Sequence, residues 1–137
     1  MSEQNKTLVR RVVEEVYNQG NLAVADELAV SDLVIHLTSQ EIRGREGAKQ
    51  YVTALRAAFP DLHMTIEDQI AEGDRVVTRW TARGTHTGEF QGIPPTGKRI
   101  RVPGTDIDRI ADSRVVECWS HVDELGMMQQ LGAIPAA

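Results

Sequence analysis

The chain has 137 residues, a formal net charge of −5, 41% hydrophobic residues and 26% charged residues. This length and composition are typical of a globular protein with one core, so we expect a single domain over residues 1–137. The acidic balance argues against nucleic acid and anionic membranes as partners, because both are bound through basic patches.

The first part of the chain is predicted to be mainly helical. Residues 6–18 repeat apolar side chains at helical spacing and place charged residues opposite them, which predicts an amphipathic helix ended by "NQGN". A second helix is predicted over 22–30 and a third over 46–59, where Pro60 stops it. Residues 32–38 are rich in β-branched side chains and predict a strand, and the "RGREG" stretch after it predicts a loop.

The pattern changes to that of strands from residue 63 onwards. Strands are predicted over 63–71, 75–88, 98–111 and 114–122, followed by a short helix over 123–132. The "EGDR" and "ADSR" turns predict antiparallel hairpins, and "EFQGIPPTG" predicts a longer loop. Helices gathered on one face of an antiparallel sheet define an α+β fold. Long strands with internal glycine curve, so helices that close the concave side would enclose a cavity.

Two aspartates in the third long strand carry the main functional signal. Asp106 and Asp108 stand two residues apart, so their side chains are predicted to share one face of the sheet. A carboxyl group in an apolar cavity has a raised pKa and can act as an acid or a base. The alternative is that one or both aspartates lie on the solvent face of the sheet.

Other polar or aromatic residues lie beside large apolar ones on the predicted strands, and they are His36, Arg79, Trp80, His86 and Ser120. A few polar groups converging in an apolar space are typical of a ligand pocket. Each residue also has a structural interpretation, such as a paired arginine or a core tryptophan. Arg79 and Trp80 are neighbours on a strand, so at most one of them can line a cavity.

Several kinds of site have no support in the sequence. It has no zinc-binding spacing, no G-x-S-x-G motif and no phosphate-binding glycine motif. We therefore expect no metal and no cofactor. The single cysteine, Cys118, excludes an intramolecular disulfide, and the polar N-terminus lacks the apolar core of a signal peptide. These features predict a cytoplasmic protein.

Three stretches together resemble the SnoaL-like polyketide cyclases (ester cyclases) of the nuclear transport factor 2-like superfamily. They are "LVRRVVEEVYNQGNLAVADEL", "RWTARGTHTGEFQGIPPTGKRI" and "GTDIDRIADSRVVECWSHVDELGMMQQLG". The resemblance implies an α+β cone, in which a curved antiparallel sheet packs against helices around an apolar cavity. It also implies closure of a ring in a polyketide by intramolecular aldol condensation, without metal or cofactor and with an aspartate as the general acid/base.

Only some of the site positions of the characterised cyclases carry the same type of residue in this sequence. The position of the catalytic aspartate of the characterised cyclases is Ser120 here, and Asp106 stands where they have a histidine. His86 matches a histidine of the family pattern, and His36 falls at a position that is often a polar pocket residue. We therefore predict Asp106 and His86 as catalytic residues. The residues predicted to contact substrate are His36, Arg79, Trp80, Asp108 and Ser120.

Three functions remain open at this point. The first is a cofactor-independent enzyme that cyclises or isomerises a hydrophobic, carbonyl-bearing small molecule. The second is a binding protein with the same cavity and no chemistry, which the serine at position 120 favours. The third is an epoxide hydrolase in which Arg79 and Asp106 hold a water molecule. A homodimer through the outer face of the sheet is also expected, with Val77 and Val115 among its exposed residues.

Overall fold

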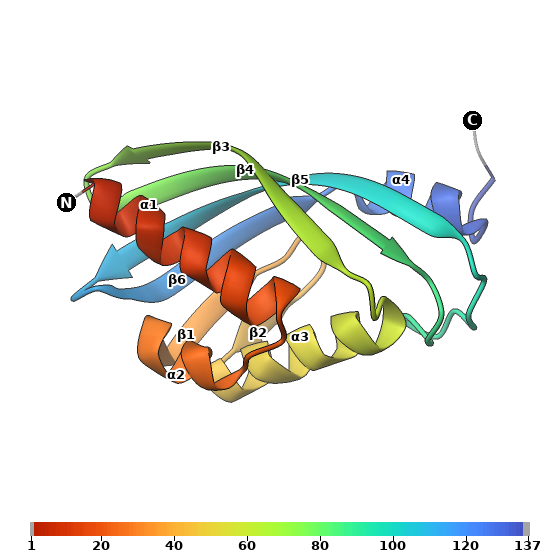
Figure 1. Cartoon of the computed structure of the whole chain (residues 1–137), viewed down its shortest axis with the longest axis horizontal. Helices are drawn as coiled ribbons and strands as arrows, with labels where there is room; N and C mark the ends of the chain where they lie inside the picture. Colours follow the sequence, from red (N-terminus) through yellow and green to blue (C-terminus); the bar gives the residue numbers. More distant parts are fainter. Residues whose placement is uncertain (1, 136–137) are drawn as a thin grey trace.

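The computed structural model describes residues 2–135 and has the predicted α+β architecture, with a curved, open sheet on one side and helices on the other (Figure 1). The helical segments are α1 (Ser2–Arg11), the π-helix η1 (Val12–Asn18), α2 (Ala23–Leu28), α3 (Arg45–Ala58) and α4 (Glu124–Leu131). The strands are β1 (Ala29–His36), β2 (Glu41–Arg43), β3 (His63–Glu72), β4 (Arg75–Thr85), β5 (Arg99–Ala111) and β6 (Arg114–Val122).

The sheet has the strand order β2-β1-β6-β5-β4-β3. The long strands β3 to β6 form the predicted antiparallel meander, and the turns at 72–75 and 111–114 close its hairpins. The expectation of an entirely antiparallel sheet is wrong at one place, because β1 pairs in parallel with β6. This pairing brings the N-terminal half of the chain beside its last strand.

Two elements near the N-terminus differ from the sequence-based expectation. The second helix ends at Leu28 instead of residue 30, because Ala29 and Val30 already belong to β1. The stretch predicted as a loop contains the short strand β2, which pairs with the end of β1. Three residues are too few to show a periodic pattern, so the sequence carried no signal for this strand.

The first helix is longer than predicted and changes type along its length. Residues 2–11 are α-helical and residues 12–18 are π-helical, and the segment buries Val9, Val13 and Val16 against the sheet. A π-helical turn is wider than an α-helical one and is frequently found at functional sites. Here it ends one residue after Tyr17, whose ring is directed between the helix and the sheet.

The end of this π-helix is tied to strand β3 by one side chain. The Asn18 amide Nδ2 donates to the Met64 carbonyl at 3.0 Å, and the Met64 N–H donates to Asn18 Oδ1 at 2.7 Å. Arg56 Nη1 donates to the carbonyl oxygens of Tyr17 and Asn18 at 2.9 and 2.8 Å. These four bonds fix the backbone beside Tyr17.

Replacing Asn18 with alanine is expected to lower the free energy of unfolding by about 1–3 kcal/mol, because both backbone groups of Met64 then lose their partner. Urea unfolding followed by circular dichroism measures the change. Asn21→Ala is the matched control, since its side chain makes no such bridge among the described residues. Equal losses in the two variants would contradict the role given to Asn18.

The buried apolar side chains form two clusters. One lies between α1, α2 and the β1–β6 part of the sheet and consists of aliphatic side chains and Cys118. The other lies between α3, α4 and the middle strands, and it contains Phe59, Trp80 and Phe90. The buried phenylalanine and tryptophan rings of the described residues therefore all lie in the second cluster, among aliphatic side chains.

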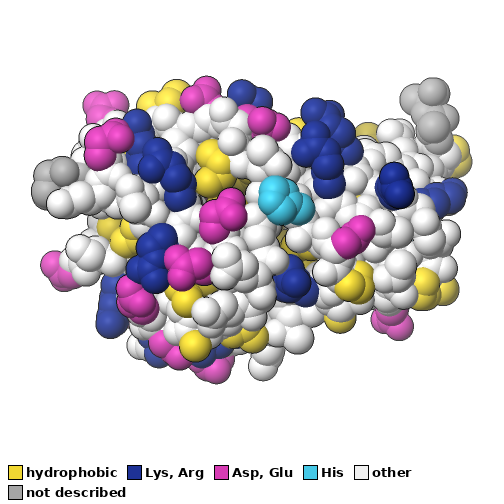
Figure 2. Space-filling model, in the orientation of Figure 1, with side chains coloured by type: hydrophobic (Ala, Val, Ile, Leu, Met, Phe, Trp, Pro, Cys, Tyr) yellow, Lys and Arg dark blue, Asp and Glu magenta, His cyan; other side chains and the backbone are white. Residues whose placement is uncertain are grey.

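Charged side chains of both signs lie on the surface of the protein. In Figure 2, Lys and Arg side chains lie among Asp and Glu side chains over the face shown. Within residues 2–135, no helix has the length and apolar character that crossing a bilayer requires.

Candidate active site

Two hollows lie between the concave face of the sheet and the helices. We call the first the aliphatic chamber, because its wall is mainly formed by aliphatic side chains, among them Val9, Val13, Val16, Leu28, Leu33 and Val52. We call the second the aromatic chamber, because Tyr51, Phe59, Trp80 and Phe90 line it. The empty space inside them, including the parts open to solvent, is about 760 and 940 Å³.

The two chambers meet at the middle of the sheet. Both are lined by Tyr17, Ile35, Met64, Asp106 and Cys118. Asp108 and Thr78 line only the aliphatic chamber, whereas Ser120 lines only the aromatic chamber. The Asp106 carboxyl group therefore stands where the chambers join.

Strand pairing places the polar groups of the site in two rows. Asp106 lies between Thr78 of β4 and Ser120 of β6, and Asp108 lies in the next row between Val76 and Cys118. The alternation of side chains along a strand thus puts both aspartates on the concave face, as predicted. Asp108 is 8% exposed, and the Oδ1 atom of Asp106 is fully buried without a hydrogen-bond partner among the described residues.

Burial raises the pKa of both carboxyl groups. Desolvation raises the pKa of Asp106, and the Ser120 hydroxyl and the Trp80 indole N–H beside it partly oppose this shift. The pKa of Asp108 is raised to about 8 by desolvation and by the nearby charge of Asp106. Because the two buried carboxyl groups are adjacent, the charge of either one favours the protonated form of the other.

Two tyrosines that the sequence-based prediction missed face the same carboxyl group. Burial raises the pKa of Tyr17 well above its usual value and that of Tyr51 to about 12, and the charge of Asp106 adds to both shifts. Both phenols are therefore protonated at neutral pH and are hydrogen-bond donors. The sequence did hold one sign that Tyr17 could belong to the site. Its hydroxyl-bearing side chain stands at the end of the apolar stripe of the first helix, four residues after Val13.

Asp106, Asp108 and Cys118 are also the residues that could hold a metal ion. One ligand atom of each lies within 4.8 Å of the others. The pKa of the Cys118 thiol is raised by burial and by the two aspartates, so a metal would have to displace protons from this set.

Arg79 and His36 do not lie in the chambers. Arg79 is exposed on the outer face of β4, so the prediction that it meets Asp106 is wrong, and Trp80 is the one of the two neighbours that lines the site. The Trp80 indole lies against Gly104, where any side chain would collide with the ring. Because Gly104 has no side chain, the large Trp80 ring fits beside it and forms part of the wall of the aromatic chamber.

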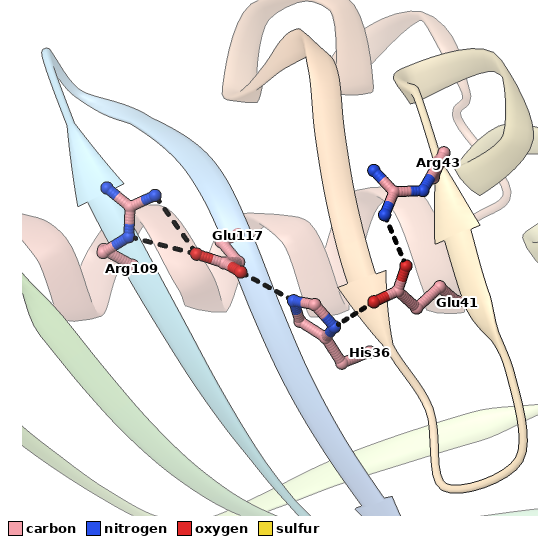
Figure 3. Close-up of polar contacts among 5 residues, drawn as sticks. All are labelled: His36, Glu41, Arg43, Arg109 and Glu117. Atoms are coloured by element: carbon pink, nitrogen blue, oxygen red, sulfur yellow. Dashed lines mark hydrogen bonds and ion pairs between the residues drawn. The ribbon is translucent and has the colours of Figure 1, made fainter.

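His36 belongs to a charged network on the outer face of the sheet (Figure 3). Its Nε2 lies 2.6 Å from Glu117 Oε2, and its Nδ1 lies 3.1 Å from Glu41 Oε1. Arg109 and Arg43 contact the same two carboxylates at 3.2 and 2.7 Å. The His36 ring also stacks on Trp119, so the expectation that it contacts a ligand in the cavity is not met.

His86 is fully buried, but it lines neither chamber. Its Nδ1 accepts hydrogen bonds from the Thr96 hydroxyl and the Thr96 N–H at 3.0 and 3.2 Å. Its ring lies against Phe59, which in turn contacts Phe90 edge to face. The structure therefore places His86 behind the wall of the aromatic chamber, where it holds the loop that carries Phe90. His86 therefore positions this loop. It lines neither chamber, so the expectation that it is a catalytic residue is not met.

Of the two valines that were predicted to lie on the outer face of the sheet, one does and one does not. Val115 is buried and lines the aliphatic chamber, so its assignment to the outer face is wrong, whereas Val77 is half-buried and faces outward beside Ile107. A homodimer through this face stays a prediction.

Comparison with known proteins agrees with this fold. The family model of the SnoaL-like polyketide cyclases matches residues 7–131, so the chain belongs to this family. The aklanonic acid methyl ester cyclase DnrD of Streptomyces peucetius is 32% identical over 135 residues, covering 91% of this chain and 88% of DnrD.

Solved structures give the same assignment. A protein of Jannaschia sp. CCS1 assigned to the SnoaL-like polyketide cyclases superposes with a TM-score of 0.90 and 29% identity, over 98% of this chain and 95% of that one. IdmH of Streptomyces antibioticus, assigned as a polyketide cyclase, gives a TM-score of 0.83 and 37% identity over 94% and 99% of the two chains. A Catenulispora acidiphila protein with a ketosteroid isomerase-like fold shares the fold alone, at 16% identity and a TM-score of 0.77.

Proposed function

We propose that this member of the family is a cofactor-independent cyclase that closes a ring in a polyketide by an intramolecular aldol reaction, with Asp106 as the general base. The observation that carries the proposal is the position of Asp106 at the junction of two apolar chambers, with the carboxyl group of Asp108 within 4.8 Å of its own. The family membership and the activity named for DnrD support the reaction class.

The strand register supports Asp106 in particular. The family resemblance places the usual catalytic aspartate at position 120, and Ser120 lies directly across from Asp106 in the β5–β6 ladder. Side chains opposite each other in such a pair lie about 4.5–5.5 Å apart at Cβ. A carboxylate at position 106 therefore reaches much of the same space as a carboxylate at position 120, from the neighbouring strand.

The carboxyl pair can perform both proton transfers of the reaction. The Asp106 carboxylate takes a proton from a carbon next to a substrate carbonyl, and the enolate carbon then attacks a second carbonyl of the same molecule. Asp108 gives its proton to the alkoxide that forms, and the proton on Asp106 passes back to Asp108. The phenols of Tyr17 and Tyr51 donate hydrogen bonds to the enolate oxygen while it carries charge.

Proton abstraction is the step that separates this enzyme from a binding protein. In D2O, the protein is expected to exchange the α-protons of a 1,3-diketone faster than they exchange without protein. In H2O, it is expected to convert aklanonic acid methyl ester into an isomer of equal mass. Proton NMR and liquid chromatography with mass spectrometry measure the two reactions. Binding of both compounds without exchange or isomerisation would replace the cyclase proposal with a binding function.

An epoxide hydrolase has less support. That reaction was predicted to use Arg79 together with Asp106, and these residues lie on opposite faces of the sheet.

A further inference from the structure

We propose that the outer face of the sheet carries a docking surface for an acidic segment of a partner protein, formed by Arg83 near the end of β4 and by Arg99 and Arg101 at the start of β5. We call these three residues the arginine cluster. All three side chains are exposed, and none of them lines either chamber. The inference therefore goes beyond the proposed function and does not depend on it.

The strand register holds the three arginines side by side. Arg83 and Arg101 are direct partners in the β4–β5 ladder, and Arg99 lies two residues before Arg101 on the same face. The backbone of Arg101 is also fixed on the side that β6 does not reach, because its N–H donates to Gln130 Oε1 at 2.7 Å and its carbonyl accepts from Gln130 Nε2 at 2.9 Å. Like charges directly opposite each other in a ladder repel. This arrangement is therefore destabilising unless a negative charge lies between the side chains.

The arginine cluster lacks the acidic partners that other arginines of this protein have. Within residues 2–135, no carboxylate forms an ion pair with any of its three members. Four arginines elsewhere each have a carboxylate oxygen within 3.2 Å, and they are Arg11, Arg43, Arg45 and Arg109. The net charge of −5 thus conceals a local group of positive charges that the chain itself leaves unpaired.

The arginine cluster borders a hollow on the surface, whose empty space, including the part open to solvent, is about 820 Å³. Asp61 is the acidic residue on this border among the described residues, and it already accepts hydrogen bonds from the Thr85 N–H and hydroxyl at 2.6 and 2.7 Å. It offsets at most one of the three positive charges, so the hollow remains positive. Because a guanidinium group can bind a carboxylate through two parallel hydrogen bonds, several carboxylates on one segment match this surface.

The surroundings of the arginine cluster favour an acidic protein segment over a nucleic acid. The described residues place no aromatic side chain in the wall of the hollow, so bases would find no ring on which to stack. The acidic balance of the whole chain also repels a long polyanion that extends beyond the cluster.

A second copy of this chain fits the arginine cluster less well than another protein does. Many of its acidic side chains are already paired with basic residues of their own chain, and these lie at positions 15, 26, 27, 41 and 46. The same carboxylates would have to leave these partners before they could bind the arginine cluster of another copy.

Rhodamine-labelled decaglutamate is the probe that tests this inference, with fluorescence anisotropy as the measurement. The unaltered protein is expected to bind it at low salt and to release it as the salt concentration rises, because salt screens exposed charges. Arg83→Gln and Arg101→Gln are each expected to weaken binding about two- to fivefold. Their melting temperatures should stay the same or rise, because each change relieves the repulsion between the two arginines.

Arg114→Gln is the matched control. Arg114 is an exposed arginine at the start of β6, also without an ion pair among the described residues, and it lies outside the hollow. This variant should bind decaglutamate like the unaltered protein. No binding at low salt, or equal losses in the Arg83 and Arg114 variants, would overturn the inference.

Two further measurements separate the other occupants. Tighter binding of a ten-nucleotide thymidine oligomer than of decaglutamate would overturn the inference in favour of a nucleic acid. Light scattering compares the unaltered protein with a variant that combines Arg83→Gln and Arg101→Gln. If only the unaltered protein formed an oligomer, the arginine cluster would be a contact between copies of this chain and the inference would be wrong. Either failure would leave the role of Asp106 untouched, because proton exchange in the chambers is measured separately.

Discussion

Replacing Asp106 with asparagine is expected to slow α-proton exchange and ring closure by about 100- to 10,000-fold, the usual contribution of a general base. Asparagine keeps the size and shape of the side chain but has no basic oxygen. The change also removes the charge that raises the pKa of Asp108. Binding of the 1,3-diketone should be retained, because asparagine fills nearly the same space in the walls of the two chambers as aspartate.

The matched control for this variant is Asp68→Asn. Asp68 is exposed and pairs in register with Arg79 on the outer face of the sheet, so this substitution makes the same chemical change outside the chambers. It should leave the exchange rate unchanged. If the Asp106 variant exchanged protons as fast as the Asp68 variant, Asp106 would not be the base.

The stability of the protein is expected to fall as the pH rises from about 4 to 8. An aspartate in the unfolded chain loses its proton near pH 4, whereas Asp108 in the folded protein keeps it until about pH 8. Between these values the folded state binds more protons than the unfolded state, so each pH unit lowers the free energy of unfolding by up to about 1.4 kcal/mol. Urea unfolding at pH 5, 6, 7 and 8 measures this slope.

Asp108→Asn should remove most of the slope and should make the protein more stable at pH 8. Asp61→Asn is the control, because the effect of this residue on stability is expected to depend on pH in the opposite direction. Asp61 accepts hydrogen bonds from the Thr85 N–H and hydroxyl at 2.6 and 2.7 Å, which lower its pKa, so its stabilising effect is lost only as the pH falls through the acidic range. An unchanged slope in Asp108→Asn would show that Asp108 is not the group that titrates.

Much of the fold follows from local patterns in the sequence. The period of apolar residues gave α3 and the four long strands to within a few residues, and their order led to the α+β class. The facing of Asp106 and Asp108 followed from strand alternation alone, because β5 keeps regular pairing on both sides of these residues. Local geometry is sufficient where an element is long and regular.

For residues outside such regular stretches, the sequence did not predict which face of the sheet the side chain occupies. The side chain of His36 points outward, while Leu33 and Ile35 point inward, and because both faces of β1 carry apolar residues the alternation did not reveal which face is buried. In β3 the register shifts between Ile66 and Asp68, so an extra residue interrupts the alternation. His86 lies behind Phe59 because the loop after β4 folds back on it, and loop geometry has no periodic signal.

The parallel pairing of β1 with β6 also determines when the molecule can assemble during its synthesis. His36 and Glu117 are 81 residues apart in the chain, and before β6 emerges from the ribosome β1 has only the three-residue β2 beside it in the sheet. Contacts of such long range slow folding, because the chain must close a large loop before it gains any interaction. The apolar side chains of β1 and α2 that pack against β6 in the folded protein therefore lack this cover until β6 has been synthesised.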